Sequence, residues 1–347
     1  MTQGQVHRPQ SRVSRASSAW PLVRGLRASM TALAIGLVLL ACGREDAGRA
    51  DGVVDASERR LRMAAADRGL EWLLRHADEM PVGWAHPFLL RLYRVAPNDE
   101  TAARIEAVLR DDSAASRRFV LPGDLSDPSL LHSLRLTPIL FELRRRKALG
   151  EPYEEHCEAL RRVLESHGDA FWPRVRLTQR GVFLHQFRDL ALPLPFDFED
   201  LLAEVEASVT QRPVAEVALD RQSLYAMTHL VLVEGRYFRE YVDADRYEAM
   251  LPILVRALDV QLNEGAGERA LDVVAEILAC LSLIRYPEDA SVLGARRRVI
   301  AAQNADGSWG DGEGVTPGRV HATLLGVLAT LVLPERLRAD PDLRATP

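Results

Sequence analysis

The sequence is poor in cysteine, in aromatic residues and in lysine. Only three cysteines occur among 347 residues, Phe, Trp and Tyr together make up 6%, and Lys147 is the only lysine. Cys157 and Cys280 lie in helical patterns. An oxidising compartment would permit a disulfide between them, but we expect two buried free thiols. The basic residues are scattered, so we expect no nucleic-acid partner.

Strand patterns and common catalytic signatures are also missing. No stretch alternates apolar and polar residues over the length of a strand, so we expect almost no β-sheet. The sequence contains no Gly-x-Ser-x-Gly, His-Glu-x-x-His, P-loop or dinucleotide-binding motif. What is present is a chain that is 47% hydrophobic with a net charge of −5. This composition is typical of a globular protein with one large core or two smaller ones.

A short apolar run near the N-terminus indicates a targeting segment. The run at 30–41 is too short to span a bilayer as a mature helix, and arginines precede it. It ends in Leu39-Leu40-Ala41-Cys42, which resembles the lipobox of bacterial lipoproteins. The resemblance implies that residues 1–41 are a signal peptide, cleaved before Cys42, and that this cysteine is acylated. An ordinary signal peptide or a single anchor helix is the alternative.

The lipobox resemblance also implies a location in the bacterial cell envelope. Such proteins face the periplasm from a lipid anchor, and Gly43 after the cysteine resembles those that reach the outer membrane. Residues 42–56 would then be a short polar tether. Because residues 1–41 hold five arginines and no acidic residue, their removal changes the net charge from −5 to −10. The acyl chains, rather than the acidic body, would therefore hold the protein to the membrane.

Helical patterns recur through the rest of the chain, with short polar breaks between them. About twelve helices are expected, enough for six pairs of an outer and an inner helix. They cover residues 57–77, 85–96, 99–111, 129–149, 152–168, 182–190, 198–210, 214–234, 245–263, 267–285, 289–303 and 317–333. The proline-rich break at 192–196 is the best candidate for a seam between subdomains. Residues 336–347 are expected to form a disordered tail.

The clearest unit, at 289–333, is a helix, a tight glycine-rich loop and a second helix. The first helix places the arginines at 296–298 on its solvent face. Thr316 is expected to cap the second helix, with Pro317 at its first position. The second helix is apolar almost all round and should be buried. An exposed helix followed by a buried one is typical of two concentric helix rings. We therefore predict an all-α fold, an α/α toroid over residues 57–335, with an open α-solenoid as the alternative.

The loop of this unit carries a recognisable motif. Gln303, Gly307 and Trp309 match the glutamine–tryptophan motif of the squalene and terpene cyclases and their relatives, the protein prenyltransferase β subunits. We expect Gln303 to close the outer helix, Gly307 to permit the turn, and Trp309 to pack on the next helix. The resemblance implies the toroid fold but not the activities. The Asp-x-Asp-Asp motif of the cyclases and the Asp-x-Cys zinc motif of the prenyltransferases are missing, and aromatic residues that stabilise carbocations are few.

Polar residues on otherwise apolar inner helices are the candidate site residues, because inner helices line the centre of a toroid. Glu276 lies in an apolar segment, and a buried carboxylate needs a partner. His229 and His321 on adjacent inner helices are the natural partners. Counting helical turns places His229 beside Glu276, with Tyr225, Asp272 and His321 in a second layer nearer the mouth. The pattern resembles that of uncharacterised bacterial toroid proteins.

These candidates leave two functional hypotheses. In the first, the protein is a lipid-anchored binding or accessory protein, whose partner is a hydrophobic small molecule or an envelope protein, and the polar cluster only fixes helix register. In the second, it is an enzyme. His229, Glu276 and His321 would then hold a divalent metal such as zinc or act as acid and base, with Tyr225 and Asp272 as weaker members.

Two other polar groups are interpreted as structural. His185 is expected to pack between helices. The basic run at 144–147 ends a helix, where cations interact favourably with the helix dipole.

Overall fold

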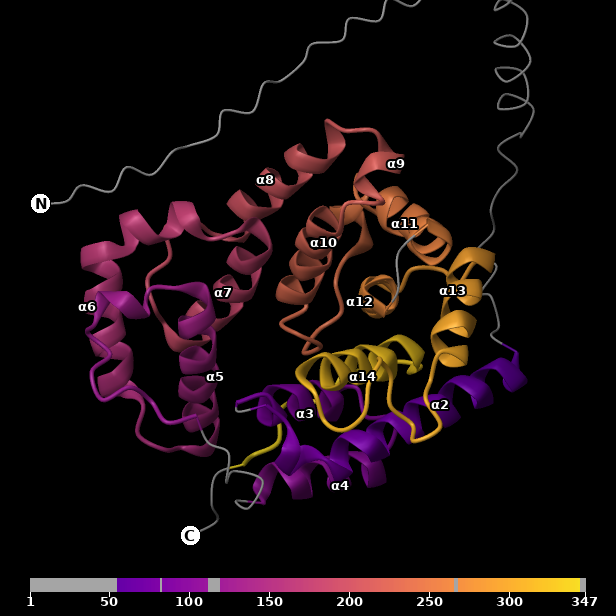
Figure 1. Cartoon of the computed structure of the whole chain (residues 1–347), viewed down its shortest axis with the longest axis horizontal. Coiled ribbons are helices and arrows are strands. Elements are labelled where there is room, and N and C mark those ends of the chain that lie inside the picture. The colour runs from indigo at the N-terminus through magenta and orange to yellow at the C-terminus, as the bar shows by residue number, and fades with distance from the viewer. Residues whose placement is uncertain (1–54, 82, 112–118, 265–267, 344–347) are drawn as a thin grey trace, which may run out of the picture. The chain divides into compact units, whose positions relative to one another are not determined.

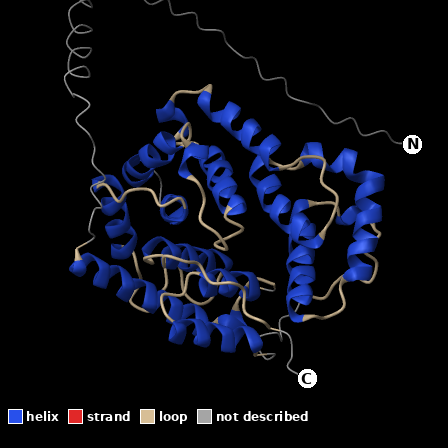
Figure 2. Cartoon of the chain, turned by 180° about the vertical axis from the view of Figure 1, so that it is seen from behind, coloured by secondary structure: helices blue, strands red, loops and turns tan. Residues whose placement is uncertain are grey.

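The computed structural model describes residues 55–81, 83–111, 119–264 and 268–343, and the structural statements below concern these residues. They form thirteen α-helices and no strand, which confirms the all-α prediction (Figure 1; Figure 2 shows the opposite side). The predicted signal peptide, Cys42 and nearly all of the tether lie outside the described residues. Of the helices that the structure describes, none is long and apolar enough to cross a membrane.

The bounds of the helices follow the sequence-based prediction closely. They are α2 (Ala56–Arg75), α3 (Ala85–Arg94), α4 (Asp99–Arg110), α5 (Ser133–Leu149), α6 (Glu154–Phe171), α7 (Leu177–Leu190), α8 (Phe198–Thr210), α9 (Val214–Val217), α10 (Arg221–Glu234), α11 (Leu251–Glu264), α12 (Glu268–Leu283), α13 (Ala290–Ala301) and α14 (Pro317–Thr330).

Two expected helices are interrupted, and one is longer than expected. The segment 214–234 divides into α9 and α10 because the Asp220 side chain accepts a hydrogen bond from the backbone of Gln222 and caps a new helix. The segment 245–263 begins with a separate 3₁₀ turn, Ala244–Tyr247, ahead of α11. Conversely, α7 begins five residues before the helix expected at 182–190.

Six helices follow one another around a circuit. α14 packs against α12, α12 against α10, α10 against α7, α7 against α5, and α5 against α3. The circuit closes where α3 returns to α14, because the rings of Phe88 and His321 lie 6.5 Å apart. Helices α4, α6, α8, α11 and α13 lie around the periphery, and α2 packs along α14 (Figure 1). These neighbours are those that the toroid prediction requires.

The interior holds two apolar clusters. The larger joins α2, α3 and α4 to the helices from α8 onward, and the smaller gathers residues of the segment 125–192. Leu194 and Phe196, in the proline-rich break at 192–196, pack against both. Cys157 and Cys280 are buried free thiols, as expected.

The expectation of a disordered tail is wrong for residues 336–343. The backbone N–H of Arg338 donates to the carbonyl oxygen of Arg94 on α3 at 2.9 Å. The Arg338 guanidinium lies 2.8 Å from the Asp99 carboxylate on α4, and Leu343 is buried. The charged side chains of the tail thus find partners on the body of the protein, a match that the tail sequence alone does not reveal. Residues 344–347 lie outside the described residues.

One arginine of α13 does not lie on the solvent face that was predicted for residues 296–298. Thr316 caps α14 and Pro317 is its first residue, as predicted. Arg297 and Arg298 are exposed, but Arg296 is only 1% exposed. Its guanidinium donates to the carbonyl oxygen of Ala329 at the end of α14. The last carbonyl groups of a helix have no partner within the helix, and a cation satisfies them well.

Candidate functional site

The glutamine–tryptophan turn joins the last helices to the first. The Gln303 side-chain N–H groups donate to the carbonyl oxygens of Gly307, at 2.8 Å, and of Ala65 on α2, at 2.9 Å. Gly307 has φ +94°, a conformation that favours glycine. The Trp309 ring is buried against Gly326 of α14, the next helix. The roles expected for Gly307 and Trp309 are confirmed, while Gln303 ties the turn to α2 rather than only closing α13.

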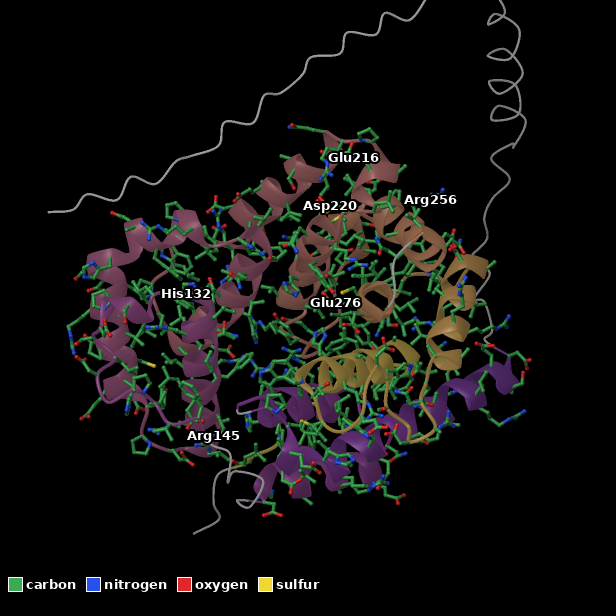
Figure 3. All side chains as sticks on the ribbon, viewed as in Figure 1. His132, Arg145, Glu216, Asp220, Arg256 and Glu276 are labelled. Atoms are coloured by element: carbon green, nitrogen blue, oxygen red, sulfur yellow. The ribbon has the colours of Figure 1, made fainter. Side chains whose placement is uncertain are left out.

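The predicted polar cluster forms two separate pairs. His229 Nε2 lies 3.7 Å from Glu276 Oε1, and His321 Nδ1 lies 3.8 Å from Asp272 Oδ2. The Thr228 hydroxyl also donates to Glu276, which lies on α12 in the interior of the molecule (Figure 3). The two layers expected from counting helical turns are therefore confirmed for these pairs.

The predicted three-residue metal site is not formed. No group of three His, Cys, Asp or Glu side chains within the described ranges could hold a metal ion. Asp272 and Glu276 are one turn apart on α12, and they face different neighbours. Asp272 meets His321 on α14, whereas Glu276 meets His229 on α10. The set of His229, Glu276 and His321 is thus divided between two layers.

The protein itself provides partners for the inner pair. His229 Nδ1 lies 2.8 Å from the carbonyl oxygen of Thr178 on α7, so Nδ1 carries the proton and donates it. The Tyr225 ring centroid lies 6.2 Å from that of His229. These contacts fix the register of α10 against α7 and α12, which agrees with the structural interpretation. Acid–base chemistry at His229 and Glu276 stays a prediction.

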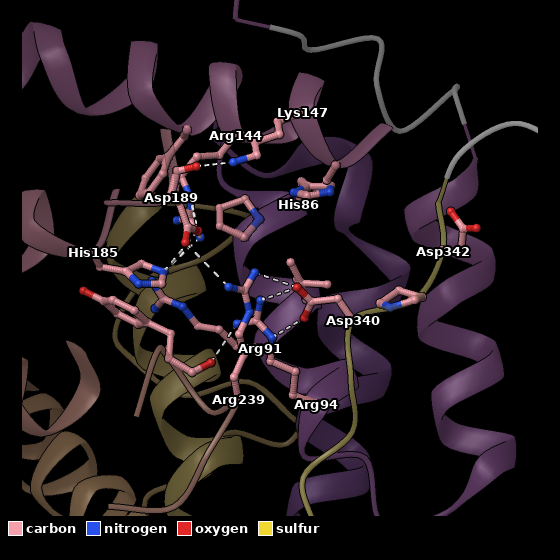
Figure 4. Close-up of a pocket in the computed structure, with 16 residues that line it drawn as sticks. His86, Arg91, Arg94, Arg144, Lys147, His185, Asp189, Arg239, Asp340 and Asp342 are labelled. Atoms are coloured by element: carbon pink, nitrogen blue, oxygen red, sulfur yellow. Dashed lines mark hydrogen bonds and ion pairs between the residues drawn. The ribbon is translucent and has the colours of Figure 1, made fainter. Parts of the chain in front are cut away.

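A cavity of about 510 Å³ lies elsewhere, toward the C-terminal ends of α5, α7 and α10 (Figure 4). Its wall includes α3, the segment after α10 and the C-terminal residues 340–342. The charged and imidazole side chains that line it are His86, Arg91, Arg94, Arg144, Lys147, His185, Asp189, Arg239, Asp340 and Asp342. No sequence pattern pointed to this site. His185 and part of the basic run at 144–147, for which structural roles were expected, belong to the wall.

Most cations of the cavity wall have carboxylate partners. Asp340 lies 2.6 Å from Arg94 and 2.6 Å from Arg239, and Asp189 lies 2.6 Å from Arg144. Dashed lines in Figure 4 mark these contacts. Two aspartates thus face three arginines, so these paired groups leave the wall with an excess of positive charge.

Arg91 differs from its neighbours. No carboxylate within the described residues lies in ion-pair distance of its guanidinium, which stacks 4.2 Å from the centre of the Tyr237 ring and 5.4 Å from that of Phe88. Burial lowers the pKa of Arg91 to about 10, so it is still charged at neutral pH. Arg91 and Arg94 are three residues apart on α3. Testing the predicted helix at 85–96 for polar residues on an inner face would have found them.

Two histidines beside these arginines are held neutral. Burial, together with Arg145, Arg144 and Arg94, lowers the pKa of His86 to about 3, and Asp340 opposes this only in part. Burial and the neighbouring arginines also place the pKa of His185 well below its usual value. The His86 Nε2 atom is buried and has no hydrogen-bond partner among the described residues.

Acidification is therefore expected to destabilise the fold through His86. In the unfolded chain a histidine takes up a proton near pH 6.5, whereas folded His86 does so only near pH 3. Between these values the unfolded state binds more protons. The free energy of unfolding should thus fall as the pH falls, by up to about 1.4 kcal/mol per pH unit for this residue.

Chemical unfolding at several pH values between about 7 and about 4 measures this slope. His86→Gln removes the titrating group and should make the slope shallower, while the exposed His167 is the matched site for a control His→Gln change. If the His86→Gln protein kept the full slope of the unaltered chain, the cause would lie in another group.

The resemblance to the cyclase and prenyltransferase superfamily, which was inferred from Gln303, Gly307 and Trp309, stays a prediction. Comparisons of this chain with protein-family models, with curated proteins and with solved structures find no match.

Proposed function

We propose that the protein binds a small anionic molecule in the cavity beside Arg91. The observation that carries the proposal is a half-buried, charged guanidinium that lines the cavity and has no carboxylate within ion-pair distance among the described residues. Partial burial of a charge without an ion-pair partner carries a cost, and an anionic ligand would relieve it. The cavity volume of about 510 Å³ falls in the range of small-molecule sites.

The rest of the wall supports a ligand with an apolar body. Pro87, Leu90, Phe141 and Tyr237 contribute apolar surface next to the arginine. His86, which is held neutral, also lines the cavity and adds no charge to it. An organic carboxylate combines an apolar body with an anionic end. That end can form a two-pronged contact with a guanidinium. This places the proposal within the binding-protein hypothesis, with an anionic rather than a purely hydrophobic ligand.

Titration calorimetry with benzoate and its neutral analogue benzamide tests the proposal. Benzoate should bind the chain from residue 43 onward, and benzamide should bind much more weakly. Arg91→Gln should weaken benzoate binding roughly 10- to 100-fold, because one charge-assisted contact is lost. Arg59→Gln, at an exposed position on α2, removes the same charge away from the cavity and should bind as the unaltered protein does.

Two outcomes would overturn the proposal. One is equal binding of benzoate and benzamide, which would mean that the charge is not recognised. The other is an equal loss of benzoate affinity in the Arg59→Gln and Arg91→Gln proteins. That result would assign the effect to net charge rather than to the cavity.

We also propose that a lipid on Cys42 holds the protein at the periplasmic face of the bacterial outer membrane. The support is the sequence Leu39-Leu40-Ala41-Cys42-Gly43 after a short apolar run. Mass spectrometry of the mature chain should find acyl groups on Cys42, and Cys42→Ser should release the protein from the membrane fraction. A mature chain that begins elsewhere and carries no lipid would refute the anchor but not the cavity proposal.

A further inference from the structure

One carboxylate of the protein itself occupies the basic end of the cavity. Asp340 Oδ1 lies 2.6 Å from Arg94 Nε, and Oδ2 lies 3.2 Å from Arg94 Nη2 and 2.6 Å from Arg239 Nη2. This is the two-pronged contact by which an arginine holds a free carboxylate. Burial raises the pKa of Asp340, but the hydrogen bonds and charges of Arg94 and Arg239 outweigh it and hold the pKa below its usual value.

The segment that carries Asp340 is attached in a way that permits exchange. Residues 331–343 contain no helix. The segment is fixed by individual contacts, such as the hydrogen bond from Tyr241 to Pro334 and the ion pair of Arg338 with the exposed Asp99. Displacing Asp340 from its two arginines would therefore break a few contacts without unfolding an element of secondary structure.

The second arginine site lies next to the first. Arg91 and Arg94 are three residues apart on α3, so they are neighbours on the helix surface, with about 5–6 Å between Cβ atoms. Both line the same cavity. One has no carboxylate partner among the described residues, and the other holds a carboxylate from the protein's own C-terminal segment.

We propose that the ligand is a short dicarboxylate, with one carboxylate on Arg91 and the second replacing Asp340 on Arg94 and Arg239. Asp340 is then an internal competitor that fills the second position when the cavity holds no ligand. This inference rests on the proposed function, because it assumes that Arg91 receives the first anionic group.

Calorimetry with glutarate and butyrate distinguishes binding at Arg91 alone from binding at both carboxylate positions. Butyrate has a similar chain but only one carboxylate. In the Asp340→Asn protein the competitor has lost its charge. Glutarate affinity should rise about tenfold or more relative to the unaltered protein, and the preference for glutarate over butyrate should rise with it. Adding Arg94→Gln to Asp340→Asn should abolish the gain. Asp78→Asn, at an exposed position, makes the same change in net charge and should produce no gain.

The inference is overturned if folded Asp340→Asn protein binds glutarate no more tightly than the unaltered protein does. It is also overturned if butyrate gains as much as glutarate. Circular dichroism verifies folding, and Asp340→Ala repeats the measurement should the asparagine variant fail to fold. Benzoate binding that still depends on Arg91 would leave the proposed function standing in either case.

Discussion

Replacing Trp309 with alanine is expected to lower the free energy of unfolding by about 3–5 kcal/mol. The side chain is 1% exposed, and its Nε1–H donates to the carbonyl oxygen of Val299 at 2.7 Å. The ring lies between two glycines. A Cβ atom at Gly69 of α2 would lie 2.5 Å from its Cζ3, and one at Gly326 of α14 would lie 2.7 Å from its Cε3. Removing the ring would leave a cavity where α2, α13 and α14 meet.

A double-mutant cycle with Gly326→Ala identifies the ring as the cause. Beside Trp309 the added methyl group overpacks the interface, which should cost about 1–3 kcal/mol. In the Trp309→Ala background the methyl group has room, and alanine favours the helix over glycine by up to about 1 kcal/mol. Urea unfolding followed by circular dichroism measures all four proteins. Additive effects of the two changes would contradict the proposed packing. Trp84→Ala, at a half-buried tryptophan, is the control and should cost less.

The parts of the fold that local sequence patterns determine could be predicted. The α13–α14 unit is an example. Thr316, Pro317 and the all-apolar segment after them act within a few residues, so the cap, the helix start and the burial of α14 all followed from the sequence. The pairing of Asp272 with His321 and of Glu276 with His229 also followed, because turns along parallel helices can be counted.

The cavity could not be predicted, because it depends on contacts between distant segments. Asp340 is 246 residues from Arg94, and nothing in the C-terminal sequence shows that it returns to α3. The place of Arg91 on the helix expected at 85–96 could have been read from the sequence, but such a pattern does not show that the neighbours of a charge lack carboxylates. Arg296 was assigned to solvent for the same reason. Its partners are the carbonyl of Ala329 and the carboxylate of Glu288, both set by tertiary packing.

Glu288 joins two buried arginines at the end of α14. Its carboxylate lies 2.7 Å from Arg62 of α2 and 3.0 Å from Arg296 of α13, and these side chains are 2% and 1% exposed. Arg62 also donates to the carbonyl oxygens of Thr330 and Leu331 at the end of α14, at 3.2 and 3.1 Å. The three charges thus connect the first helix of the described chain to the last two.

Replacing Glu288 with alanine is expected to destabilise the fold by about 3–5 kcal/mol, since it leaves two buried guanidinium groups without a counter-charge. Urea unfolding measures the loss, which should persist at high salt because buried charges are screened little. Glu204→Ala breaks an ion pair with Arg180 in which the glutamate side chain is 52% exposed, and it should cost no more than about 1 kcal/mol. Equal costs for Glu288→Ala and Glu204→Ala would show that the cluster behaves as a surface pair. Glu288→Ala should lower the free energy of unfolding more than Glu204→Ala does. If the loss from Glu288→Ala is smaller in an Arg62→Met background, where one of the two unpaired arginines is gone, the effect is due to unpaired buried charge.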